Sequence, residues 1–146
     1  MARQRSVAEH DLILTMEIHQ LRDQLRFPLG AEFRWCPGAP LDVELTFHPP
    51  GAAPVTWILG RDLLTRGVRT LVGEGDVRIR PASGPGREGQ ALLRVGAEPQ
   101  VALFALDRAE LRSWLEETWE AVPAEAEAER LDWAFLDALL AGHPGR

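Results

Sequence analysis

Apolar and polar residues alternate along the segment DLILTMEIHQ, residues 11–20. Its apolar face consists of Leu12, Leu14, Met16 and Ile18, and its polar face of Thr15, Glu17 and His19. Successive side chains of a β-strand point to opposite faces, whereas a helix repeats about every 3.6 residues. The segment is therefore predicted to be a strand with one buried face.

The same alternation recurs in five further segments bounded by turn residues. They are residues 31–35 (AEFRW), 41–48 (LDVELTFH), 54–59 (PVTWIL), 76–80 (DVRIR) and 91–95 (ALLRV). Their predicted inward-facing residues are Ala31, Phe33, Trp35, Leu41, Val43, Leu45, Phe47, Val55, Trp57, Leu59, Val77, Ile79, Ala91, Leu93 and Val95. Turn residues in PGAP, PPGAAP and GPGREG separate several of the segments. Residues 100–106, QVALFAL, alternate less cleanly and predict a strand buried on both faces, which brings the total to about seven strands.

The period of the pattern changes after Leu106. Asp107, with Glu110 three residues later, has the layout of a helix-capping box in which aspartate replaces serine or threonine. An apolar stripe at helical spacing follows, made of Leu111, Trp114, Leu115, Thr118, Trp119 and Val122, and Pro123 ends it. Residues 131–140, LDWAFLDALL, predict a second helix. A short helix, RDLLTR at 61–66, is predicted between the fourth and fifth strands, with Gly67 at its C′ position.

The order of these elements, strands first and helices last, is typical of an α+β fold. A chain of 146 residues suits one domain, since a domain of this size buries roughly 70% of the surface of its unfolded chain. We expect a single domain over residues 1–146, with residues 1–10 flexible. No apolar run approaches the roughly 20 residues of a membrane span, which favours a soluble, cytoplasmic protein.

Charge is distributed unevenly along the chain. The formal net charge is −6, and all 16 basic residues are arginine. Residues 107–137 contain ten acidic and three basic residues, a net charge of −7 (3 − 10), so the remainder carries +1 (13 − 12). A nucleic-acid-binding protein would concentrate basic residues to neutralise phosphates. The acidic segment instead favours protein contacts or solubility.

The residue types that usually carry catalysis or bind metals are scattered. His10, His19, His48 and His143 do not have the spacing of a metal site. Cys36, the single cysteine, has no identifiable histidine partner. The serines lack the glycine context of a nucleophile elbow. We therefore expect no metal, cofactor or catalytic group, and interpret the protein as a non-enzyme.

Residues 73–76, GEGD, raise the question of a phosphate-binding loop. Such a loop precedes a helix whose N-terminus faces the phosphate, but here a predicted strand follows. Asp76 would also repel a phosphate. The motif is therefore predicted to be a tight turn. Arg61 and Asp62 are predicted to start the short helix, where aspartate favours the positive end of the helix dipole.

Taken in their order and spacing, these motifs resemble the SsgA-like proteins. The matching string comprises TFH (46–48), Val55, Trp57, RDLL (61–64), Gly67 and the pattern G-x-G-D-V-x-x-x-P from Gly73 to Pro81. The resemblance is strongest over residues 41–81, covers most of the chain by element order, and favours the SsgB type, which is similar in length. SsgA-like proteins are small sporulation and cell-division regulators of filamentous actinobacteria, whose GC-rich coding suits the all-arginine usage.

The resemblance implies a non-enzymatic protein that positions the division machinery at future septa. The implied partners are the tubulin-like division protein FtsZ and SsgA. The implied fold has two antiparallel sheets with C-terminal helices, like the Whirly-type single-stranded nucleic-acid-binding proteins, and assembles as a homotrimer. This fold likeness is associational evidence for function.

Two alternatives to a division adaptor remain open. The first is single-stranded nucleic-acid binding, which needs a basic groove and stacking aromatic residues. Arg34 between Phe33 and Trp35 motivates this reading, but both aromatic residues have the inward phase and the net charge is negative. The second is an enzyme, which a deep polar pocket would favour.

Three residues are candidate partner contacts. Arg61 and Asp76 belong to the motifs above and would meet a partner if exposed. Trp133 lies about 200° from Leu131 on the predicted helix, off its apolar stripe. Its indole is packed in a groove of its own chain or of a neighbouring subunit, or it anchors a division partner, with Asp132 and Asp137 steering a basic surface.

Overall fold

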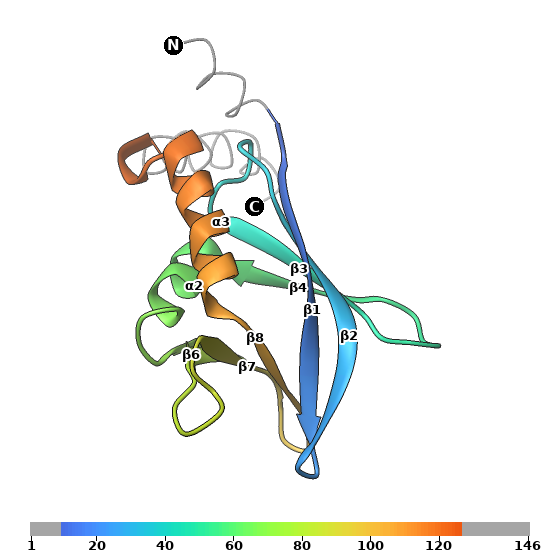
Figure 1. Cartoon of the computed structure of the whole chain (residues 1–146). Helices are drawn as coiled ribbons and strands as arrows, with labels where there is room; N and C mark the ends of the chain where they lie inside the picture. The colour runs from blue at the N-terminus through green and yellow to red at the C-terminus, as the bar shows by residue number, and fades with distance from the viewer. Residues whose placement is uncertain (1–9, 127–146) are drawn as a thin grey trace, which may run out of the picture.

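The computed structural model describes residues 10–126, and these form an eight-stranded antiparallel sheet with two helices (Figure 1). The strands are β1 (Leu12–Arg22), β2 (Leu25–Trp35), β3 (Asp42–His48), β4 (Val55–Gly60), β5 (Val72–Glu74), β6 (Val77–Pro81), β7 (Gln90–Ala97) and β8 (Gln100–Asp107). The helices are α2 (Arg61–Gly67) and α3 (Arg108–Ala121). The strand order is β4-β3-β2-β1-β8-β7-β6-β5. The sheet curls, and both helices pack on its inner face.

The strands form one sheet, which corrects the expectation of two. β1 pairs with β2 along its whole length, but it pairs with β8 only over His19–Leu21, opposite Leu103–Ala105. The sheet is therefore two four-stranded halves joined by a short ladder near the end of β1. Each half turns away from the other beyond this junction (Figure 1). The sequence pattern alone does not contain this pairing, because it depends on residues about eighty positions apart in the chain.

The hairpin between β1 and β2 was not predicted from the sequence. Arg22 pairs with Leu25, and the two residues between them, Asp23 and Gln24, have φ values of 52° and 64°. Two positive φ values in a two-residue loop are the signature of a type I′ turn, for which Asn-Gly and Asp-Gly are the usual sequences. Gln24 stands where glycine is usual in such a turn, so the sequence gives only a weak indication of a hairpin here.

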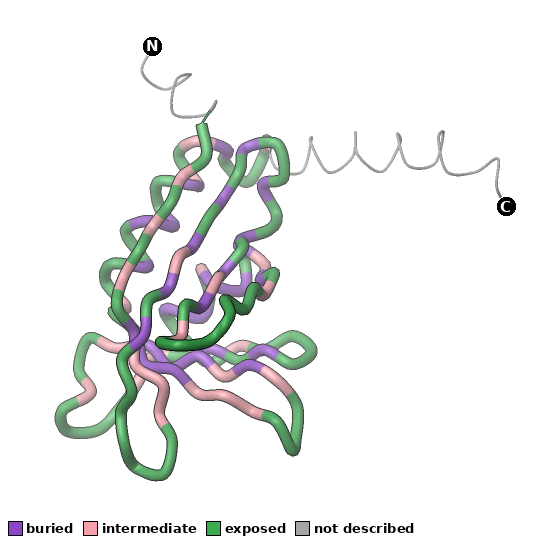
Figure 2. Tube along the Cα trace, turned by 90° about the vertical axis from the view of Figure 1, so that its right-hand side faces the viewer, coloured by how far each residue is buried: buried purple, intermediate pink, exposed green. Residues whose placement is uncertain are grey.

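The predicted alternation of buried and exposed residues is confirmed along most strands (Figure 2). Among the predicted inward residues, Phe33, Trp35, Val43, Leu45, Ile79, Ala91 and Leu93 are fully buried. Leu41 and Val55 are exceptions, with 38% and 49% of their surfaces exposed. Leu41 precedes the first residue of β3, and Val55 begins the edge strand β4, so each lacks neighbours on one side. The double burial predicted for residues 100–106 is confirmed for 104–106 only.

Helix α3 begins and packs as its sequence predicts. The Asp107 carboxylate accepts a hydrogen bond from the Glu110 backbone N–H at 2.9 Å, which caps the helix. Leu111, Trp114 and Leu115 are buried against the inner face of the sheet. The helix ends at Ala121, two residues before Pro123. The second predicted helix, residues 131–140, lies outside the described residues.

The role of Gly67 differs from the prediction. It is the last residue of α2 rather than a left-handed C′ residue, and the chain continues through Val68 with φ −75°. A Cβ atom at position 67 would collide with the side chain of Ile79, including its Cβ at 3.0 Å. Glycine is required here because α2 approaches β6 closely. Among residues 10–126, no helix combines the length and apolar composition needed to cross a bilayer.

Candidate protein-interaction surface

Arg61 lies in the core, so it does not meet the condition of exposure that its role as a candidate partner contact requires. Its relative exposure is 0%, and it is the first residue of α2. Its guanidinium carbon lies 3.6 Å from the ring centroid of Trp119 and 5.3 Å from that of Trp35. Its Nη1 donates to the backbone oxygen of Thr118 at 2.8 Å. A cation over aromatic faces and at the C-terminal end of a helix is favourable on both counts.

A second set of polar contacts extends from Arg61 and joins α2 to α3. The hydroxyl of Thr65 donates to the backbone oxygen of Arg61, and the indole N–H of Trp119 donates to the same hydroxyl, both at 2.8 Å. The RDLL motif therefore contributes packing inside the chain. Trp119, which sequence reasoning left unsettled, is a half-buried part of this network.

Asp76 lies on the surface, in the turn between β5 and β6. Glu74 pairs with Val77, so Gly75 and Asp76 form a two-residue loop, and Gly75 has a φ of 58°. The prediction that GEGD is a tight turn is confirmed. Asp76 is exposed, and its backbone oxygen accepts a hydrogen bond from the Gly96 N–H at 2.9 Å. Trp133, the third candidate contact, lies outside the described residues.

The histidines and the cysteine do not assemble into a site in the part of the chain that the structure describes. His19 and His48 project from the same sheet face, but β2 separates their strands. Cys36 is exposed at the end of β2. Residues 10–126 contain no group of three or more His, Cys, Asp or Glu side chains suited to a metal ion.

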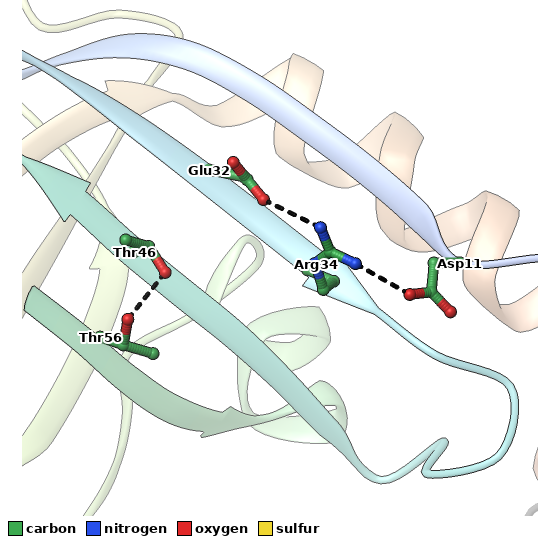
Figure 3. Close-up of polar contacts among 5 residues, drawn as sticks. All are labelled: Asp11, Glu32, Arg34, Thr46 and Thr56. Carbon is green, nitrogen blue, oxygen red and sulfur yellow. Dashed lines mark hydrogen bonds and ion pairs between the residues drawn. The ribbon is translucent and has the colours of Figure 1, made fainter. Parts of the chain in front are cut away.

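The sheet face turned away from the helices, which we call the outer face, is acidic over β1–β4. Its outward charged residues along these strands are four acidic and two basic ones, Glu17, Arg26, Glu32, Arg34, Asp42 and Glu44. The guanidinium of Arg34 lies 3.0 Å from Asp11 and 3.6 Å from Glu32, and the hydroxyls of Thr46 and Thr56 are 2.8 Å apart (Figure 3). These pairs are exposed, so they contribute little to stability. They leave a polar, negatively charged surface.

The outer face is basic over β6 and β7. Arg78, Arg80 and Arg94 point outward, since their strand neighbours Val77, Ile79 and Leu93 belong to the core. Arg78 and Arg94 are directly opposite each other on paired strands. We call this region the arginine half of the outer face.

The inner face contains an apolar hollow of about 380 Å³ between the two halves of the sheet. Phe47 and Phe104 stack at its base, with ring centroids 4.4 Å apart and planes at 16°. Val55 and Trp57 of the edge strand β4 line its rim. The hollow brings an exposed aliphatic residue and a half-buried indole together on one surface.

Comparison with known proteins identifies the family. The sequence profile described as the Streptomyces sporulation and cell division protein SsgA matches residues 29–127. The sporulation-specific cell division protein SsgB of Thermobifida fusca is 36% identical over 121 residues, covering 83% of this chain and 85% of that protein. SsgB of Streptomyces coelicolor is 34% identical over 105 residues, covering 72% and 76%.

Solved structures agree with the sequence relatives. The crystal structure of an SsgA-like sporulation-specific cell division protein from Thermobifida fusca has a TM-score of 0.78 and 31% identity, covering 93% of this chain and 97% of that chain. A structure reported with mutations in SsgB that correlate to longitudinal cell division during sporulation of Streptomyces coelicolor has a TM-score of 0.75 and 27% identity, covering 83% and 95%. The chain therefore belongs to the SsgA family of sporulation and cell division proteins.

Proposed function

We propose that this chain is a non-enzymatic regulator of cell division and sporulation that recruits or positions FtsZ through protein contacts at the septum. The observation that carries the proposal is its similarity to SsgB proteins over most of its length. The acidic region of the outer face over β1–β4 and the arginine half are both proposed surfaces for such contacts. Asp76, exposed on the β5–β6 turn, and Trp133 are proposed contacts within this role.

Co-sedimentation with FtsZ polymers tests the proposal. FtsZ from the native host is assembled with GTP and pelleted with and without the chain, and we expect the chain in the pellet only when polymer is present. Asp76→Lys should reduce the pelleted fraction severalfold, because it reverses a charge at a proposed contact. Glu116→Lys, a charge reversal on the exposed side of α3, is the matched control. A chain that stays in the supernatant at all FtsZ concentrations would contradict recruitment by direct contact.

We also propose that the chain forms a homotrimer. The apolar hollow of the inner face and the adjacent edge strand β4 support self-association, since exposed edges and apolar patches are normally covered. SsgA is a further proposed partner.

Single-stranded nucleic-acid binding by a Whirly-like fold is the alternative function. The arginine half of the outer face favours it, because phosphates need basic neighbours. Phe33 and Trp35, the aromatic residues that first motivated it, have 0% exposure and are therefore not available to stack on bases. Fluorescence polarisation with a labelled oligonucleotide at low salt distinguishes nucleic-acid binding from FtsZ recruitment. Only nucleic-acid binding predicts that the chain forms a salt-sensitive complex with the oligonucleotide.

A further inference from the structure

A hollow of about 410 Å³ lies on the outer face where the β1–β2 hairpin meets β6, β7 and the loop 82–89. Its floor is made of three leucines, Leu21, Leu92 and Leu103. Leu21 and Leu103 are directly paired across β1 and β8. Leu92 points away from the main core, yet only 7% of its surface is exposed. The hollow thus has an apolar base on a face that is otherwise polar.

Three arginines line the same hollow. Arg22 comes from the end of β1, Arg80 from β6 and Arg87 from the loop 82–89. In the described part of the chain, none of the three forms an ion pair with an acidic side chain. The guanidinium of Arg22 lies 4.8 Å from the ring centroid of Phe27, which is paired with Gln20 on the inner face, so its charge is directed away from the leucines. Arg80 donates to the backbone oxygen of Pro81 at 3.3 Å. Their charges are therefore not compensated by ion pairs with carboxylates of residues 10–126.

The strands beside the hollow add further positive charge. Arg78 and Arg94 face each other directly across β6 and β7, an arrangement in which like charges repel. Arg94 is only partly compensated by Glu98 at 3.9 Å, whose side chain is 82% exposed. Among residues 10–126, Asp23 is the one carboxylate in the lining of the hollow. Positive charge is thus concentrated on one patch of a chain whose net charge is −6.

This combination points to a specific ligand chemistry. Arginine forks pair bidentately with carboxylates, and a leucine floor accepts an apolar side chain. We propose that the hollow binds an acidic peptide segment of a protein partner, with carboxylates on Arg80 and Arg87 and an apolar residue on the leucines. The inference rests on the proposed function, because it supplies the chemistry of the partner segment for a protein that acts through protein contacts.

A probe peptide tests the site without any division protein. The probe is a fluorescein-labelled peptide of about twelve residues that combines aspartate and glutamate with a few leucines, and its counterpart carries the corresponding amides. We expect the acidic probe to bind in a fluorescence polarisation titration at low salt and to weaken as salt screens the arginines. The amide peptide should bind about tenfold more weakly or worse, since each lost charged hydrogen bond costs about that factor.

Matched variants locate the binding. Arg80→Gln combined with Arg87→Gln should weaken the acidic probe about tenfold or more. Arg69→Gln combined with Arg112→Gln removes the same charge from exposed positions elsewhere and should change the affinity less than about twofold. Thermal unfolding of both variants checks that the fold is intact. If the two double variants lose affinity equally, binding follows net charge and the site is refuted.

Two other results would also overturn the proposal. Equal binding of the acidic and amide peptides would remove the role of the arginines. The second result concerns a labelled oligothymidine. If it binds the chain, if this binding is lost in the double variant of Arg80 and Arg87, and if the acidic peptide does not displace it, the site is assigned to nucleic acid. Failure of the chain to bind FtsZ leaves the probe result intact, so the two proposals are separately testable.

Discussion

The guanidinium of Arg61 lies against two tryptophan rings and donates to the end of α3, so its charge contributes to the packing of α2 on α3. The planar group can stack on an indole and direct its N–H groups sideways at the same time. An ammonium group is a compact point charge and cannot reproduce both contacts. The sequence motif drew attention to this residue but left its burial undecided, because a motif carries no information about burial.

Arg61→Lys is therefore expected to lower the free energy of unfolding by about 2 kcal/mol, the combined scale of a desolvated cation–π contact and a charged hydrogen bond. Urea denaturation followed by tryptophan fluorescence measures the change. Arg66→Lys is the control on the same helix, because Arg66 is exposed and its ion pair within residues 10–126 is with Asp62, at 2.8 Å. It should cost less than about 0.5 kcal/mol. Equal stability of the two variants would contradict a structural role for Arg61.

Asp107 connects the last strand to α3, and its carboxylate satisfies one of the free N–H groups of the first helical turn. Asp107→Ala should destabilise the chain by about 1 kcal/mol, a typical cost of losing an N-cap side chain. Asp107→Asn keeps the acceptor and should retain most of the stability. Thermal unfolding distinguishes them, and an alanine variant as stable as the asparagine variant would show that the cap is dispensable.

Elements with a strong local signal were predictable from the sequence. α3 has a capping residue, an apolar stripe and a terminating proline, and the strands with strict alternation follow their predicted faces. β2 was found only from Ala31 onward, because Pro28 interrupts the pattern within it. The strand tolerates Pro28 because β3 begins to pair only at Gly30, which leaves that side of β2 open at residue 28.

Features that depend on pairing between distant strands were not predictable. The leucines and arginines of the outer hollow, such as Leu21, Arg80 and Arg87, are far apart in sequence and line one hollow because β1 pairs with β8. Each arginine alone is an ordinary polar residue of a strand or loop. The single sheet has the same origin, since the short ladder between β1 and β8 decides it.

At the scale of the whole molecule, charge is separated between the two halves of the sheet. The outer face is acidic over β1–β4 and basic around β6 and β7, and the short β1–β8 ladder joins the two regions. Complementary patches on one molecule orient charged partners as they approach, and salt weakens this effect. The inner face differs from the outer face in polarity, because its hollow is apolar and the rim of the hollow includes the exposed Val55.

Val55 and Ile58 of β4 allow the surface used in self-association to be identified. Both are aliphatic and about equally exposed, at 49% and 55%, but Val55 lines the inner hollow and Ile58 points to the outer face. If the proposed trimer forms through the rim of the hollow, Val55→Glu should convert it to a monomer, since an unpaired carboxylate in an apolar interface is costly. Ile58→Glu should leave the trimer intact. Light scattering coupled to size exclusion measures the mass at tens of micromolar, and a monomeric parent chain, or a trimer lost only with Ile58→Glu, would refute this interface.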